Sequence, residues 1–130
     1  MKAEFLTPLT GSWIDDDIFE VQSDLRYSST LLNEQIFVPV GFQTDFASVP
    51  RVPIIYTIFG NRAHHESVIH DYCYRYAPNN MPRIVADKIF LESMESRGKS
   101  LFIRQGMYQG VRLGAWNVWR KYRKNQSNKK

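Results

Sequence analysis

The stretch His70-Asp71-Tyr72-Cys73-Tyr74 is the segment around which the rest of this chain is organised. It sets an imidazole beside a carboxylate and adds aromatic side chains within one helical turn. Polar groups of this kind cost free energy when they are buried without partners. Their place inside an apolar pattern therefore indicates a structural or catalytic role. No other segment of the sequence points as clearly to chemistry.

Apolar spacing predicts a helix over residues 62–77 and a second helix beyond a turn at residues 78–80. Asn61 is expected to cap the first helix, and His70 falls on its inner stripe. Asp87 takes a core position of the second helix, where an unpaired carboxylate would cost several kcal/mol. The tight turn predicts antiparallel packing of the two helices, which brings Asp87 within reach of His70.

Short β-branched and aromatic runs, separated by turn residues, fill the first third of the chain and predict an antiparallel β platform of three to five strands. The runs lie at residues 4–6, 11–13, 18–21, 25–27 and 35–40. A last helix is expected from Leu101 to about Tyr122, with Ser100 as its cap. The expected fold is therefore α+β, with a β platform followed by three helices.

Size and cysteine content limit the class of protein. The chain has 130 residues, 43% of them hydrophobic, which suits one domain with its own core. We expect this domain to cover residues 1–122. The single cysteine, Cys73, excludes an intramolecular disulfide framework. Neither a signal peptide nor an apolar run of membrane-spanning length is apparent, which predicts a protein that is soluble where it is made.

The positive charge of the chain is concentrated at its C-terminal end. Residues 120–130 hold six of the 17 basic side chains and no acid, which leaves 11 basic against 13 acidic side chains elsewhere. We interpret residues 123–130 as a flexible, solvated basic tail. The alternative is contact with an anionic surface, but six charges do not define a specific nucleic-acid site.

The segment at residues 41–53 sets small hydroxyl-bearing side chains and a carboxylate between aromatic residues, and prolines close it. This composition predicts a rigid, extended loop. Two interpretations of it stay open. Thr44, Asp45 and Ser48 satisfy nearby backbone groups, or Asp45 faces the His70 site.

Two chemical interpretations of His70 and Asp87 also stay open. A carboxylate that holds one imidazole nitrogen fixes the tautomer and leaves the other nitrogen free to take a proton from water. Asp71, pointing elsewhere from the same helical turn, would then ligate a hard cation together with loop oxygens. The alternative is a structural bond between His70 and Asp87 that ties two helices together, with Asp71 exposed.

The pattern His-Asp-x-x-Tyr at residues 70–74, with Arg-x-x-Ala-Asp-x-x-Phe at residues 83–90, resembles the core of the secreted phospholipase A2 superfamily, especially its short prokaryotic branch. The resemblance implies that His70 activates water, that Asp87 and Tyr74 orient His70, and that Asp71 is a calcium ligand. The Gly-rich calcium loop of that superfamily and the disulfide between its paired helices are absent from this sequence.

A longer pattern runs from Phe42 to Pro50 as Phe-x-Thr-Asp-Phe-Ala-Ser-Val-Pro and continues into the two helical motifs. It resembles a family of small bacteriophage and prophage proteins, the domain of unknown function 1353. The resemblance implies a phage-encoded protein, located in the host cytoplasm or associated with the virion.

Together the two resemblances predict a phage-associated hydrolase that acts on a lipid or another envelope ester. Asp71, with Asp45 or loop carbonyl groups, would hold Ca²⁺ or another divalent cation, and no organic cofactor is implied. Thr44 and Ser48 would belong to the supporting loop. The alternative is a non-catalytic structural or host-interaction protein with a phage or host protein partner, in which the same His/Asp cluster is structural.

Overall fold

The computed structural model describes residues 2–48 and 64–128. Within these residues six short strands come first: β1 (Glu4–Phe5), β2 (Gly11–Trp13), β3 (Phe19–Val21), β4 (Leu25–Ser29), β5 (Glu34–Val38) and β6 (Gln43–Thr44). The helices follow: α2 (His64–Tyr76), α3 (Arg83–Ser96), α4 (Leu101–Gly114) and α5 (Trp116–Asn128), with a 3₁₀ turn, η1 (Pro78–Asn80), between α2 and α3. The predicted α+β class is confirmed.

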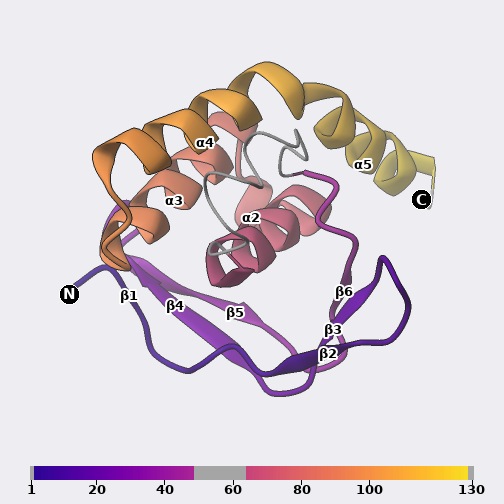
Figure 1. The fold of residues 1–130 in the computed structure, drawn as a ribbon. Coiled ribbons are helices and arrows are strands. Elements are labelled where there is room, and N and C mark those ends of the chain that lie inside the picture. The colour runs from indigo at the N-terminus through magenta and orange to yellow at the C-terminus, as the bar shows by residue number, and fades with distance from the viewer. Residues whose placement is uncertain (1, 49–63, 129–130) are drawn as a thin grey trace.

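The strands form two three-stranded antiparallel sheets on one side of the molecule (Figure 1). One sheet has the order β1-β4-β5 and the other the order β2-β3-β6. The register of the first sheet pairs Leu25 with Val38 and Tyr27 with Ile36, and all four side chains are buried. Because successive side chains of a strand point to opposite faces of the sheet, this register determines which face of the sheet packs against the helices.

Helix α2 lies in the interior, between the sheets and the other helices (Figure 1). It contacts α3 and α5 and also strands β5 and β6. Its apolar residues Val68, Ile69 and Cys73 have no exposed surface. Because α2 is covered on several sides, the polar side chains that it carries are also taken into the interior.

The prediction of one last helix over residues 101–122 is wrong, because the chain breaks at Ala115 into α4 and α5. The described residues thus contain four α-helices where the sequence predicted three. At the end of α4 the Arg83 guanidinium binds two backbone carbonyl groups. Its Nη1 donates to the Val111 carbonyl oxygen at 3.2 Å and its Nη2 to that of Arg112 at 3.3 Å. The cap predicted at Ser100 is present, since its side chain accepts from the Ile103 amide.

Helix α5 continues to Asn128, so residues 123–128, which we interpreted from the sequence as a flexible tail, are helical. Arg123 accounts for part of this order. Its Nη2 donates to the carbonyl oxygens of Tyr74 and Arg75, at 2.7 and 2.8 Å. A guanidinium at this place caps the C-terminal end of α2, where cations are favoured.

Some predicted features lie outside the described residues: the Asn61 cap, residues 62–63 of the first helix, residues 49–53 of the proline-closed loop, and the last two residues of the tail. Among the residues that the structure does describe, no helix combines the length and the apolar character that crossing a bilayer requires.

Glu92 connects α3 to the β4–β5 hairpin and provides a test of the fold. Its carboxylate accepts from the Tyr27 hydroxyl at 2.6 Å, from the Thr30 hydroxyl at 2.8 Å and from the Leu31 amide at 2.9 Å. Burial raises the pKa of Glu92, but these hydrogen bonds outweigh it and hold the pKa below its ordinary value of 4.5.

We predict that Glu92→Gln lowers the free energy of unfolding by about 2 kcal/mol at pH 7, because an amide cannot accept all three bonds. A lowered carboxyl pKa stabilises the folded state above pH 4.5, and this contribution is lost as the pH falls through the folded-state value. Urea unfolding from pH 7 to pH 3 should therefore show the variant and the wild type converging in acid. Glu95→Gln, an exposed neighbour on α3, is the control. Equal stability of Glu92→Gln and wild type at pH 7 would contradict the prediction.

Candidate functional site

His70 lies in the middle of α2 with its side chain completely buried. Its Nε2 is 2.7 Å from Oδ1 of Asp87 on α3, so the structure brings together the two residues that the helix pattern predicted as neighbours. The ring packs between Tyr74 and Phe90, with centroid distances of 4.3 and 4.7 Å. Packing and the carboxylate together fix the orientation of the imidazole.

Asp87 has three further partners besides His70. The Tyr74 hydroxyl donates to Oδ1 at 2.7 Å. Arg112 Nη1 donates to Oδ2 at 2.7 Å, and Arg83 Nη1 lies 3.5 Å from the same oxygen. Burial raises the pKa of Asp87, but the hydrogen bonds from His70, Tyr74 and Arg112 outweigh it and lower the pKa below 3.8. Asp87 is therefore an ionised, fully partnered carboxylate.

The two arginines at Asp87 had no role in the sequence interpretation. Arg83 stood in the motif quoted above, and its position four residues before Asp87 on one helix is a usable signal for an ion pair. Arg112 comes from α4 and is 25 residues away along the chain. No local pattern could have identified it.

Ser48 lies at the second nitrogen of His70. Its Oγ is 3.1 Å from Nδ1, and the residue is 1% exposed. Because the Asp87 carboxylate is an acceptor, the imidazole proton belongs on Nε2, and Nδ1 then accepts from the Ser48 hydroxyl. The result is a continuous hydroxyl–imidazole–carboxylate chain from Ser48 to Asp87. The sequence placed Ser48 in a supporting loop but did not assign it this contact.

Asp71 is buried on the side of α2 that faces β6, so the exposed Asp71 expected by the structural alternative is wrong. Thr44 Oγ1 donates to its Oδ2 at 2.6 Å, and Arg75 Nη2 lies 3.7 Å from the same oxygen. Its Oδ1 is buried and has no hydrogen-bond partner among the described residues. Burial raises the pKa of Asp71 above 3.8, although Thr44 and Arg75 act in the opposite direction.

The loop that carries Thr44, Asp45 and Ser48 satisfies backbone groups of its own, as the first of the two interpretations of the sequence expected. Thr44 Oγ1 accepts from the Phe46 amide and Asp45 Oδ1 from the Ala47 amide, both at 2.9 Å, as in a hydrogen-bonded turn. At the same time Thr44 and Ser48 reach Asp71 and His70. The Asp45 side chain is half-buried and is not bonded to His70, and its charge contributes to the raised pKa of Asp71.

A calcium site was expected from Asp71 and Asp45 with loop oxygens. The unpartnered Oδ1 of Asp71 is the kind of atom that a cation would take. However, the described part of the chain contains no group of three or more His, Cys, Asp or Glu side chains arranged to hold a metal ion. Calcium takes about six to eight oxygens, and Arg75 already places a positive charge near Asp71. The described residues alone therefore do not form a calcium site.

Asp71→Asn tests the state of this carboxylate. Asparagine keeps an oxygen for the Thr44 hydroxyl and removes a buried charge whose Oδ1 has no partner, so we predict that the free energy of unfolding rises by about 1 kcal/mol at pH 7. A raised carboxyl pKa means that the folded state binds the proton more tightly, so the penalty acts above the folded-state pKa and disappears as the pH falls through it.

Thermal and urea unfolding of wild type and Asp71→Asn between pH 7 and pH 3 would measure this difference, with Asp17→Asn, at an exposed aspartate away from the site, as the control. A variant that is clearly less stable than wild type at pH 7 would contradict this prediction. It would show that the partners of the Asp71 carboxylate fully offset the free-energy cost of burying its charge.

Comparison with known proteins shows the family to which this chain belongs. A search of curated proteins and a search of solved structures found no match to the chain. The family described as Protein of unknown function (DUF1353) matches residues 19–111, more than half of the chain. The match includes the Thr44–Ser48 loop, the His70–Tyr74 stretch, Arg83 and Asp87, and it ends one residue before Arg112. The chain therefore belongs to the DUF1353 family.

Proposed function

We propose that this protein is a hydrolase in which His70 is the general base. The observation that carries the proposal is the hydrogen-bonded chain from Ser48 Oγ through His70 to Asp87, with distances of 3.1 and 2.7 Å. An imidazole held by a carboxylate at one nitrogen and facing a hydroxyl at the other is arranged to take a proton from an attacking oxygen.

Each residue of the chain has a defined role in this proposal. Asp87 holds the Nε2–H tautomer and stabilises the imidazolium that forms when Nδ1 takes the proton. Tyr74 and Arg112 hold Asp87 in place through bonds of 2.7 Å each. The attacking oxygen is either the Ser48 hydroxyl itself or a water that takes its position at Nδ1.

The substrate class in this proposal is a carboxylic ester, of a lipid or another envelope component. The resemblance of residues 70–90 to the phospholipase A2 superfamily supports it, and the resemblance to phage proteins supports a role in the host cytoplasm or the virion. The family match itself names no activity.

A second candidate function is favoured by a specific observation. The His70 side chain is 0% exposed, Ser48 is 1% exposed, and both imidazole nitrogens are bonded within the protein. A catalytic imidazole must meet its substrate, so hydrolysis requires an opening beside Ser48. A non-catalytic phage structural or host-interaction protein, in which the same bonds pin α2 to α3 and to the loop, requires none.

Hydrolysis of p-nitrophenyl butyrate and of phosphatidylglycerol vesicles, each with and without calcium, separates the two functions. We predict that the wild type is active and that His70→Gln lowers kcat by about 100-fold or more, the usual contribution of a general base. Glu95→Gln, exposed and remote from the network, should keep full activity. Circular dichroism and melting temperature must accompany each assay, because His70 is buried.

Ser48→Ala keeps the test decisive where His70→Gln fails to fold, because it removes one buried hydroxyl. A loss as large as that expected for His70→Gln would identify Ser48 as the nucleophile, and retained activity would identify water as the attacking group. Both results support a His70-based hydrolase. No hydrolysis by the folded wild type on either substrate, together with a large fall in melting temperature for His70→Gln, would overturn the proposal in favour of the structural role.

A further inference from the structure

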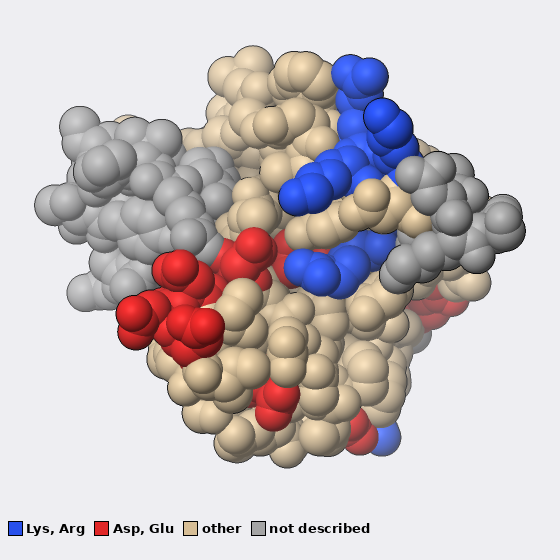
Figure 2. Space-filling view, turned by 90° about the vertical axis from the view of Figure 1, so that its right-hand side faces the viewer, with Lys and Arg blue, Asp and Glu red and all other residues tan. Residues whose placement is uncertain are grey.

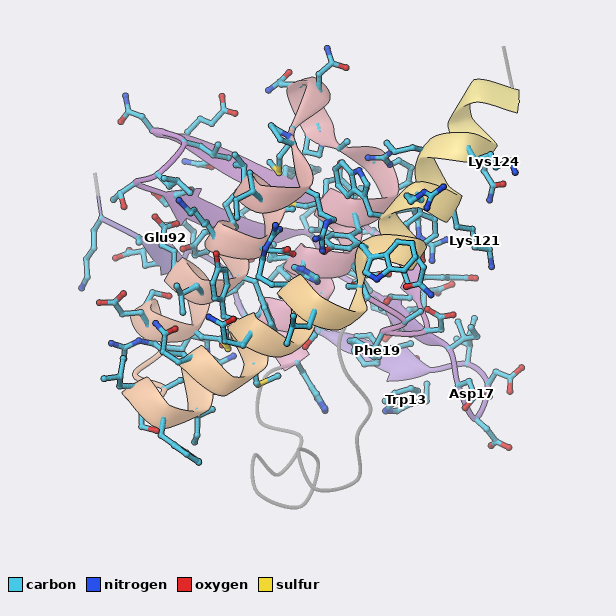
Figure 3. All side chains as sticks on the ribbon, turned by 90° about the horizontal axis from the view of Figure 1, so that it is seen from above. Trp13, Asp17, Phe19, Glu92, Lys121 and Lys124 are labelled. Atoms are coloured by element: carbon cyan, nitrogen blue, oxygen red, sulfur yellow. The ribbon has the colours of Figure 1, made fainter. Side chains whose placement is uncertain are left out.

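The outward side of α5 is strongly cationic. Arg120, Lys121 and Lys124 are exposed on it, and the helix has no acidic residue between Trp116 and Asn128. Figure 2 looks onto the side of the molecule where α5 lies and shows Lys and Arg side chains gathered there, with acidic side chains beside the lower of them. Lys121 and Lys124 point away from the body of the protein (Figure 3). Such a patch attracts polyanions.

The same side of α5 contains a shallow hollow of about 620 Å³. Two indoles, those of Trp116 and Trp119, and the four cationic side chains of residues 120–124 line it. The Trp116 side chain is 50% exposed, and the Arg120 guanidinium lies 5.5 Å from its ring centre. The hollow thus combines an accessible aromatic surface with positive charge.

The remaining side of α5 is already used by the fold. Val118, Trp119 and Tyr122 pack against the hydrophobic core. The Trp119 ring meets Tyr74 edge-on at 5.2 Å, and the Arg123 guanidinium lies over it at 4.3 Å. A helix that binds a lipid surface inserts its apolar side, and on α5 that side is not available. Charges that face outward beside one exposed indole fit a polyanion with stackable rings better than they fit a bilayer.

We propose that the outward side of α5 binds single-stranded nucleic acid without sequence preference. Arg120, Lys121 and Lys124 contact successive phosphates, and Trp116 stacks on a base. Cations one helical turn apart with an aromatic platform beside them are the features by which proteins hold single strands. This surface is separate from the His70 network, so the proposal is independent of the hydrolase proposal.

Fluorescence anisotropy with a labelled single-stranded oligothymidylate and the full chain tests the proposal. The first variant replaces three exposed cations of α5: Arg120→Gln, Lys121→Gln and Lys124→Gln. The matched control replaces three exposed cations elsewhere and reaches the same net charge: Lys2→Gln, Arg26→Gln and Lys88→Gln. We expect the slope of log affinity against log salt to fall by about 2 in the α5 variant, at about 0.7 per phosphate contact, and to stay unchanged in the control.

Trp116→Ala should lower the affinity about fivefold or more and leave the salt slope unchanged, because stacking does not release counterions. The proposal is overturned if the oligonucleotide does not bind, or if the control variant loses as much affinity as the α5 variant. Equal binding of polyglutamate would overturn it as well, since that polymer has no bases. Binding to anionic vesicles without binding to the oligonucleotide would show that the surface serves a membrane instead.

Discussion

The Asp87 carboxylate is the group on which the helical half of the structure depends. It is completely buried, and it reaches α2 through His70 and Tyr74 and α4 through Arg112. A buried carboxylate without these partners would cost several kcal/mol, so α3 can pack in its observed position only when the other two helices are in theirs. The same carboxylate draws in Arg83, which also donates to the carbonyl oxygens of Val111 and Arg112 at the end of α4. The Asp87 carboxylate therefore ties α2, α3 and α4 together. One of its partners, Arg83, also binds the backbone where α4 ends and α5 follows.

Helix α2 repeats this principle along its length. Three of the ionisable side chains that it buries find their partners in different parts of the fold. Glu66 lies 3.2 Å from the Arg97 Nε just beyond α3, His70 pairs with Asp87, and Asp71 accepts from the Thr44 hydroxyl of β6. Polar contacts thus bind α2 both to the neighbouring helices and to the strand layer. They also set its rotation, because turning the helix would leave several buried charges unpaired at once.

Features that arise from local spacing could be predicted from the sequence. The helix pair, the Ser100 cap and the approach of Asp87 to His70 follow from helical periodicity and a tight turn, and the mixed α+β class follows from strand-like runs before helical ones. Features that arise between distant segments could not. Arg112 reaches Asp87 from another helix, and Arg83 from α3 binds the backbone carbonyl groups at the end of α4. The two-residue strand β6 has no pattern of its own, since Thr44 is held there by pairing with Phe19 and by its bond to Asp71.

The protonation of the His70 ring tests the central claim most directly, because the whole chain from Ser48 to Asp87 depends on it. Two-bond proton–nitrogen correlation spectra of the ¹⁵N-histidine-labelled protein at pH 7 distinguish the two neutral tautomers, and the loss of signals in His70→Gln assigns them. The account predicts a proton on Nε2 and a bare Nδ1 that accepts from Ser48. A proton on Nδ1 in place of Nε2 would contradict it, because His70 would then have no lone pair facing the hydroxyl.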